Sequence, residues 1–180
     1  MRRLLLIGPG GAGKSTLACE IGARTGLPVI HLDRLYWQPG WVETPREQWR
    51  EILDEQLARD AWVMDGNFGG TLEQRLAACD TVIFFDLPPL LCLSRVLRRR
   101  LRYRGRHRPD MAPGCQEKID LPFLWWILSY RHRKRRSLLP RLRAWAEHPP
   151  RRLIVLDSVR AVDAFTATLP ATDAKTAESA

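Results

Sequence analysis

Residues 8–16, Gly8-Pro9-Gly10-Gly11-Ala12-Gly13-Lys14-Ser15-Thr16, decide the fold. They match the pattern GxxxxGK[S/T] and lie between an apolar run at residues 3–7 and a helical pattern that begins at Lys14. A phosphate-binding loop needs this placement, because the glycines let backbone N–H groups surround phosphate oxygens at the positive end of the helix that follows. We predict binding of ATP or GTP through Gly8, Gly10, Gly11, Ala12, Gly13, Lys14, Ser15 and Thr16, with Ser15 also a Mg²⁺ ligand.

Short apolar runs alternate with helical patterns along the rest of the chain. Nearly all-apolar strands separated by helices indicate a mostly parallel sheet covered on both faces, so the expected fold class is α/β with about five strands. The expected strands are 3–7, 28–32, 61–64, 81–85 and 153–156, and the expected helices are 14–24, 45–59, 72–78, 90–102 and 119–137. Thr44 is expected to cap the second helix, with Pro45 at its first position.

The length of 180 residues indicates one domain, residues 1–169, followed by a tail, 170–180, that lacks apolar anchors and is expected to be disordered. No apolar stretch approaches the roughly 18 residues that cross a bilayer, and no signal-peptide cleavage pattern follows the N-terminus. A cytoplasmic protein without a membrane partner is therefore expected. Four cysteines stand far apart without a CxxC pair, which predicts reduced thiols rather than zinc or disulfides.

Carboxylates follow several of the expected strands, where parallel sheets place their binding loops. Asp65 is the predicted second protein ligand of Mg²⁺. Asp33 is an alternative for that role, or it binds an acceptor hydroxyl and helps to take its proton. A cap or turn stays open for both residues, and Asp86, before Leu87-Pro88-Pro89, is predicted to be a structural turn residue.

The net charge of +9 is unevenly distributed. Residues 91–152 hold 18 Lys and Arg against 4 Asp and Glu, a net of +14, which indicates a segment that meets negative charge. Arginines that neutralise a triphosphate are one explanation, and a nucleic-acid surface at Arg98–Arg100 and at residues 131–136 is a second. An anionic membrane is the third. The neighbouring apolar run 121–128 is expected to pack inside the protein rather than on a membrane, and Trp37, Trp41 and Trp49 to line or support an acceptor pocket.

Three segments together carry a resemblance to known proteins. They are His31-Leu32-Asp33-Arg34-Leu35-Tyr36-Trp37, Trp62-Val63-Met64-Asp65-Gly66-Asn67-Phe68, and Arg104-Gly105-Arg106-His107-Arg108-Pro109-Asp110-Met111, the last followed by Cys115 and by Glu117-Lys118-Ile119-Asp120-Leu121. The chain resembles the adenylate kinase group of P-loop small-molecule kinases, and more narrowly the bacterial DNA topology modulation proteins. The resemblance covers nearly all of the chain before its tail.

The resemblance implies roles for particular residues. Asp65 would assist Mg²⁺, while Arg95 and Arg99 would stack on the adenine and reach the phosphates. The segment 95–136 would hold a lid, whose loop 103–118 closes over the triphosphate with Arg104, Arg106 and Arg108. Where adenylate kinases have a Pro-Arg pair that binds the acceptor's phosphate, this chain reads Asn67-Phe68-Gly69-Gly70, so a nucleoside monophosphate is not singled out as acceptor.

Two functions remain open from the sequence. One is a phosphotransferase that moves the ATP γ-phosphoryl group to a small-molecule or nucleotide acceptor, with Lys14, Asp33 and Arg99 as catalytic residues. The other is a nucleotide-regulated DNA-binding protein with slow or no transfer. Because arginines flank a lid loop and no DNA-reading module is visible, the sequence favours the phosphotransferase.

Overall fold

A computed structural model describes residues 1–103, 110–115 and 119–171. The lid arginines Arg104, Arg106 and Arg108, the lid residues 116–118 and most of the expected tail lie outside this described part. The elements in chain order are β1 (Arg3–Ile7), α1 (Lys14–Thr25), β2 (Val29–His31), α2 (Leu32–Tyr36), β3 (Trp37–Gln38), β4 (Val42–Glu43), α3 (Arg46–Leu57), β5 (Trp62–Asp65), η1 (Gly69–Thr71), α4 (Leu72–Ala78), β6 (Thr81–Phe85), α5 (Pro89–Arg102), α6 (Leu121–Ser137), α7 (Leu139–Ala146), β7 (Arg152–Leu156) and α8 (Val159–Ala167).

The predicted α/β class is confirmed. Five parallel strands form one sheet in the order β2-β5-β1-β6-β7, and β3 and β4 form a separate antiparallel pair. All five predicted strands are present with small shifts at their ends. The central position of β1 places the loop that follows it between the carboxyl ends of β5 and β6, where binding loops of parallel sheets gather.

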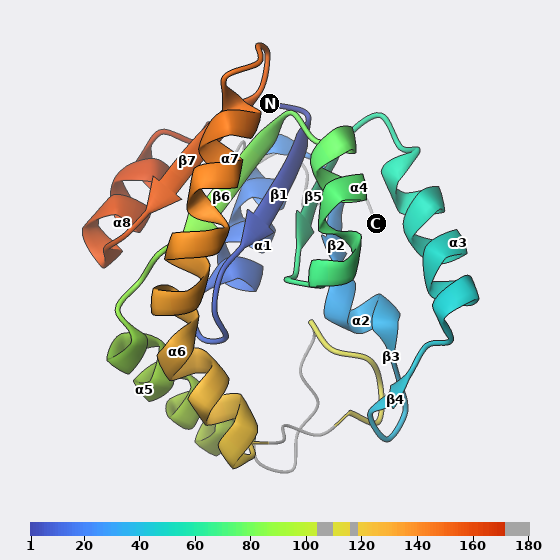
Figure 1. Cartoon of the computed structure of the whole chain (residues 1–180), viewed down its shortest axis with the longest axis vertical. Coiled ribbons are helices and arrows are strands. Elements are labelled where there is room, and N and C mark those ends of the chain that lie inside the picture. The colour runs from blue at the N-terminus through green and yellow to red at the C-terminus, as the bar shows by residue number, and fades with distance from the viewer. Residues whose placement is uncertain (104–109, 116–118, 172–180) are drawn as a thin grey trace.

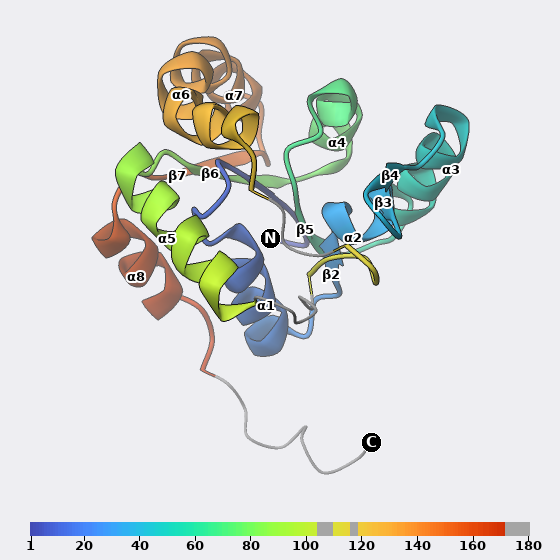
Figure 2. The ribbon, with the colours of Figure 1, turned by 90° about the horizontal axis from the view of Figure 1, so that it is seen from below.

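Helices cover both faces of the sheet (Figures 1 and 2). Alternation along β1 separates two cores, because Leu4 and Leu6 pack with α1, α5 and α8 while Leu5 and Ile7 pack with α3, α4 and α7. Figure 2 shows the same division, with α1, α5 and α8 on one side and α3, α4, α6 and α7 on the other. Strands buried on both faces explain why their sequences are almost wholly apolar.

The start of α3 differs from the expectation. The helix begins at Arg46, Pro45 is its cap residue with extended backbone angles, and the Thr44 side chain makes no capping hydrogen bond. Instead the Thr44 hydroxyl donates to the carbonyl oxygen of Tyr36 at 2.5 Å, and its backbone N–H donates to the same oxygen. Thr44 therefore closes the β3–β4 hairpin onto α2, a tertiary use that a helix-start pattern does not reveal.

The apolar run 121–128 divides between two environments. Ile127 is buried and Phe123 and Trp126 are half-buried, as a packing segment should be, but Leu121, Trp125 and Leu128 are exposed. The expectation that the run packs inside the protein is thus correct for one face of α6 and wrong for the other.

Candidate functional site

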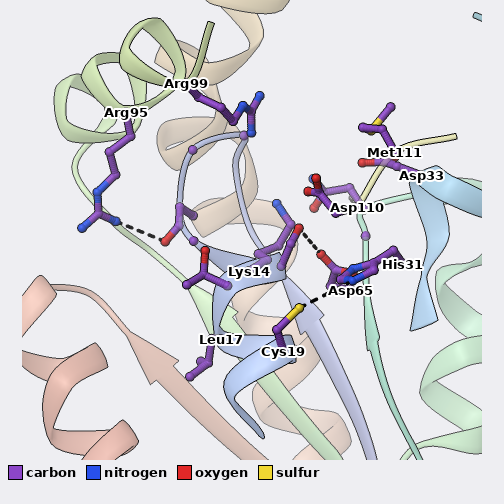
Figure 3. A pocket seen from close by; sticks show the side chains of 18 of the residues that line it. Lys14, Leu17, Cys19, His31, Asp33, Asp65, Arg95, Arg99, Asp110 and Met111 are labelled. Atoms are coloured by element: carbon purple, nitrogen blue, oxygen red, sulfur yellow. Dashed lines mark hydrogen bonds and ion pairs between the residues drawn. The ribbon is translucent and has the colours of Figure 1, made fainter. Parts of the chain in front are cut away.

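Residues 8–16 form a tight loop that leads directly into α1. Gly13 precedes the helix with a φ of 96°, and Gly11 has a φ of 78°. A Cβ atom at Gly11 would lie 2.2 Å from the carbonyl oxygen of Cys92, so the loop can approach α5 only without a side chain there. This approach brings Arg95 of α5 to the loop, where its guanidinium donates to the Ala12 carbonyl at 3.4 Å (Figure 3).

The Lys14 ammonium lies inside the loop it belongs to. Its Nζ donates to the carbonyl oxygens of Gly8, at 2.9 Å, and Pro9, at 3.0 Å. Desolvation lowers the pKa of Lys14, and the nearby carboxylates of Asp65 and Asp33 oppose that shift. The loop thus holds a desolvated positive charge against its own carbonyl oxygens at the start of α1, and a positive charge at this place attracts a polyphosphate.

Asp65 is the centre of a chain of polar contacts at the end of β5. The Ser15 hydroxyl donates to Asp65 Oδ2 at 2.6 Å, and His31 Nδ1 lies 2.6 Å from Asp65 Oδ1. Cys19 Sγ lies 3.7 Å from the other imidazole nitrogen of His31. Burial lowers the pKa of His31, but the hydrogen bond and the charge of Asp65 outweigh it, so the net shift is upward. Figure 3 shows these side chains converging from α1, β2 and β5.

The contact of His31 with Asp65 was not expected from the sequence. The parallel pairing of β2 with β5 sets His31 directly opposite Asp65. Adjacent parallel strands in register bring two strand-end residues together although 34 positions separate them. Only the register of that pair, which a single sequence does not fix, could have revealed the contact.

Asn67 makes two hydrogen bonds with the backbone of Gly8, the first glycine of the loop. Its Nδ2 donates to the Gly8 carbonyl at 2.8 Å, and the Gly8 N–H donates to Asn67 Oδ1 at 3.2 Å. The Tyr130 hydroxyl of α6 donates to the same Oδ1 at 3.1 Å. Asn67, at the position where the resemblance would place a substrate-binding Pro-Arg pair, therefore shapes the loop.

Arg75 holds the segment that carries Asn67. It is fully buried in α4, and its guanidinium donates to the carbonyl oxygens of Gly66, at 3.0 Å, Asn67, at 2.6 Å, and Phe68, at 2.7 Å. Burial lowers its pKa to about 10, so it remains charged at neutral pH. The sequence did contain a signal, because Arg75 shares the buried face of α4 with Leu72 and Leu76.

The loop opens into one cleft of about 1660 Å³. Arg95, Arg98, Arg99 and Arg102 line it from α5, and Phe123 and Trp126 line it from α6. We call residues 8–16 with Asp65 and Asn67 the loop side of the cleft. Its hairpin side consists of α2, β3, β4 and residues 110–115. Every residue that the sequence singled out for catalysis or for the metal lies at this cleft: Lys14, Ser15, Asp33, Asp65 and Arg99. Arg95, which was predicted to bind the nucleotide, lies there as well.

The hairpin side joins segments that lie far apart in the sequence. Cys115 donates its thiol to the Gln38 carbonyl at 3.2 Å, and the Gly40 N–H donates to the Gly114 carbonyl at 3.4 Å. Met111 is buried against the hairpin tryptophans. Asp33, Trp37, Trp41, Asp110 and Met111 face the cleft from this side, whereas Trp49 supports it from behind by packing on Tyr36 and Phe68. The predicted place of the three tryptophans agrees with this arrangement.

Asp86 has a structural role, as expected. The sequence predicted a turn residue, whereas the structure shows ion pairs with helix α6. Its carboxylate is almost wholly buried and accepts from Arg131 Nε and Arg135 Nη1 of α6, each at 3.1 Å. Two arginines of the predicted nucleic-acid surface are thus engaged by a carboxylate at the end of β6. Arg98 and Arg99, from the other basic run, line the cleft.

Comparisons with known proteins give the fold. No protein-family profile and no curated protein matches the chain. Among solved structures, a gluconokinase from Sinorhizobium meliloti 1021 aligns with a TM-score of 0.54 at 17% identity, over 92% of this chain and 91% of that one. The chain has the fold of the P-loop kinases. A shikimate kinase from Bacteroides thetaiotaomicron (TM-score 0.49, 18% identity, 92% and 94% covered) and a sugar kinase from Janibacter sp. HTCC2649 (0.48, 19%, 87% and 85%) also align.

At 17% identity, the likeness to the gluconokinase shows the fold alone, and the chemistry of the chain has to be argued from the residues of the cleft. The narrower resemblance to the DNA topology modulation proteins, and the adenylate kinase type within the kinases, stay predictions.

Proposed function

We propose that this chain is a P-loop phosphotransferase that moves the γ-phosphoryl group of ATP to a small hydroxyl- or phosphate-bearing acceptor. The observation that carries the proposal is the convergence, in one cleft, of the phosphate-binding loop, two arginines from α5 and a carboxylate from α2. A fold shared with a gluconokinase supports the same class of reaction.

The nucleotide is assigned to the loop side of the cleft. Backbone N–H groups of residues 8–16 would bind the β and γ phosphates, and the Lys14 ammonium would exchange its two carbonyl contacts for phosphate oxygens. Arg95 already contacts the loop through the Ala12 carbonyl, and Arg99 lies one helical turn further along α5. This spacing places both side chains on the cleft side of α5, and we assign Arg99 to the phosphoryl group in transfer.

Ser15 and Asp65 are the residues that would hold Mg²⁺. Their oxygens lie 2.6 Å apart, which supplies neighbouring hard ligands on one side only. In the described part of the chain, no cluster of three or more acidic, histidine or cysteine side chains could hold a metal alone. This donor set fits a cation that completes its shell with phosphate oxygens and water. Bound there, Mg²⁺ would neutralise charge on the phosphates.

Asp33 is assigned to the acceptor. It faces the cleft from the first turn of α2, on the opposite side from α5 (Figure 3). In transfer to a hydroxyl, the acceptor oxygen forms a bond to the γ-phosphorus, the bond to the β-phosphate oxygen breaks, and ADP leaves. The proton of the hydroxyl passes to the Asp33 carboxylate. Trp37 and Trp41 offer flat apolar surfaces on which an acceptor ring could stack.

The size of the cleft supports two substrates rather than one. Sites for a single small ligand measure roughly 300 to 1,000 Å³. The volume of about 1660 Å³ leaves room for an acceptor beside a nucleotide, as transfer requires.

The test is to incubate the protein with γ-labelled ATP and Mg²⁺ and with panels of sugars, other small alcohols, nucleosides and nucleotides, and to follow the label. Label on one class of acceptor, lost in Lys14→Ala, is the expected result. Label released only as inorganic phosphate with every acceptor would contradict transfer and favour the nucleotide-regulated binding protein.

A further inference from the structure

Helices α5 and α6 leave an apolar surface exposed. Nine large apolar side chains are exposed in the described part of the chain, and six of them belong to these two helices. Four are more than two thirds exposed: Leu121 at 81%, Leu101 at 74%, Leu90 at 73% and Trp125 at 68%. Single exposed apolar residues are ordinary on a protein surface, but a concentration on one pair of elements marks an interaction site.

The six residues form one stripe on each helix. Leu90, Leu97 and Leu101 are spaced by seven and four positions along α5, and Leu121, Trp125 and Leu128 by four and three along α6. These spacings place each set on one side of its helix. We call the six residues together the outer face of α5 and α6.

The outer face points away from the cleft. On α5 the cleft is lined by Arg95, Arg98, Arg99 and Arg102, and the core by Cys92 and Val96. Leu97 and Leu101 lie on the remaining side of the helix. Helices α5 and α6 pack on each other and lie side by side in Figure 2. Because each stripe lies on neither the core side nor the cleft side of its helix, both stripes are on the exterior of the pair.

A basic cavity lies at one end of the outer face. It measures about 290 Å³ and is lined by Pro89, Leu128, Arg131, His132, Arg135 and Arg136. The buried carboxylate of Asp86 fixes Arg131 and Arg135 at its wall. The cavity therefore joins an apolar edge at Leu128 to preoriented guanidinium groups, a combination that suits an anionic group attached to an apolar chain.

The positive charge of α5 and α6 favours a negatively charged partner for the outer face. Together α5 and α6 carry ten arginines and lysines and no aspartate or glutamate. A second copy of the chain would bring like charges together across the contact, which disfavours self-association through this face. A nucleic acid supplies phosphates but no apolar layer to cover the leucines and Trp125. An anionic phospholipid leaflet supplies both.

We propose that the outer face of α5 and α6 docks the protein on an anionic phospholipid surface, with Leu97, Leu101, Trp125 and their neighbours entering the headgroup boundary and the basic cavity receiving a lipid phosphate. No helix among the described residues is long and apolar enough to cross a membrane, so the contact is with the surface. The cleft, on other sides of α5 and α6, stays accessible while the protein is docked. The proposal does not depend on the phosphotransferase assignment.

Vesicle sedimentation of the full chain tests the proposal. We expect binding to phosphatidylcholine vesicles that contain phosphatidylglycerol, weakened but not abolished by high salt, and little binding to phosphatidylcholine alone. The variant Leu97→Gln/Trp125→Gln should lose about a hundredfold in affinity, roughly tenfold for each apolar side chain. The control Val42→Gln/Val159→Gln changes two exposed apolar residues elsewhere and should bind like the parent.

A second pair of variants tests the basic cavity. Arg136→Ser removes a lining residue and should weaken vesicle binding about fivefold. Arg133→Ser removes an exposed arginine of the same helix that does not line the cavity, and should weaken binding less. Equal losses would overturn the role of the cavity. Circular dichroism and thermal unfolding confirm that each variant folds.

Three results would overturn the docking proposal as a whole. The first is equal binding to neutral and anionic vesicles. The second is anionic-vesicle binding that Leu97→Gln/Trp125→Gln leaves unchanged. The third is a dimer, measured by sedimentation equilibrium, that the same variant dissociates, because the outer face would then be covered by a second copy.

Discussion

The two sides of the cleft are built by different means. On the loop side, the contiguous residues 8–16 form the binding surface. Lys14 and Asn67 donate hydrogen bonds to the Gly8 carbonyl, and Tyr130 donates one to the Asn67 side chain. On the hairpin side, residues 110–115 meet a hairpin more than 70 positions earlier through Cys115 and Gly114. Under the proposed function, the loop side would bind the phosphates and the hairpin side would bind the acceptor.

The sharpest test of the loop side is Lys14→Ala. Removing the charge that would interact with the β and γ phosphates should lower kcat/KM roughly 30- to 1,000-fold, about 2–4 kcal/mol of transition-state stabilisation. Because the ammonium contacts only carbonyls of its own loop, the fold should survive. Steady-state kinetics and a thermal unfolding curve measure the two effects. Unchanged turnover would refute the loop assignment.

Asp65→Asn and Asp33→Asn should separate the two sides. Asp65→Asn disturbs the contacts with Ser15 and His31, so Mg²⁺-dependent ATP hydrolysis without acceptor should fall roughly 10- to 100-fold. Asp33→Asn should leave that hydrolysis largely intact and lower transfer by roughly 100-fold or more. Reversed phenotypes would exchange the two roles, and two silent variants would mean that both residues are structural.

Arg75→Met asks whether the loop side depends on its buried support. The substitution leaves three backbone carbonyls, those of Gly66, Asn67 and Phe68, without their charged donor. We expect a loss of about 2–3 kcal/mol in the free energy of unfolding and a raised KM for ATP. Arg75→Lys, which keeps the charge but not the forked geometry, should recover part of the stability. Chemical denaturation would measure both, and equal stability of all three proteins would contradict a supporting role.

Gly114→Ala gives the smallest expected effect and acts on the hairpin side. Gly114 has a φ of 78°, and an added Cβ would lie 3.1 Å from the Pro39 Cβ. The substitution should cost about 1–2 kcal/mol of local strain. The KM for the acceptor should rise severalfold while the KM for ATP stays constant. An equal rise in both constants would show that the two sides are not independent.

The predictable parts of the molecule are those that adjacent residues specify. The apolar runs gave all five strands of the sheet because strands buried on both faces need no partner to be recognised. The loop and its lysine followed from a contiguous motif. Short elements such as α2 and the β3–β4 hairpin were missed, since elements of two to five residues carry no usable periodicity.

The site residues that were missed share a different cause. His31 and Arg75 owe their roles to partners that the strand register and the packing of α4 bring to them. The same is true of Thr44, whose hydroxyl serves a hairpin rather than a helix start. The sequence could indicate that Arg75 is buried, but the hydrogen-bond partners of all three side chains become known only from the structure.

The two ion pairs between Asp86 and α6 also restrict rotation of this helix about its axis. Arg131 and Arg135 lie one turn apart, and each bonds a different oxygen of the same buried carboxylate. If the helix rolled about its own axis, at least one of the two bonds would break. Trp126 lies about 8 Å along the helix axis from Arg131, and the Phe123 ring stacks on the Trp126 ring at a centroid distance of 5.8 Å. Both aromatic side chains therefore keep a fixed orientation toward the cleft. A carboxylate that does not line the cleft thus sets the orientation of two aromatic side chains that do.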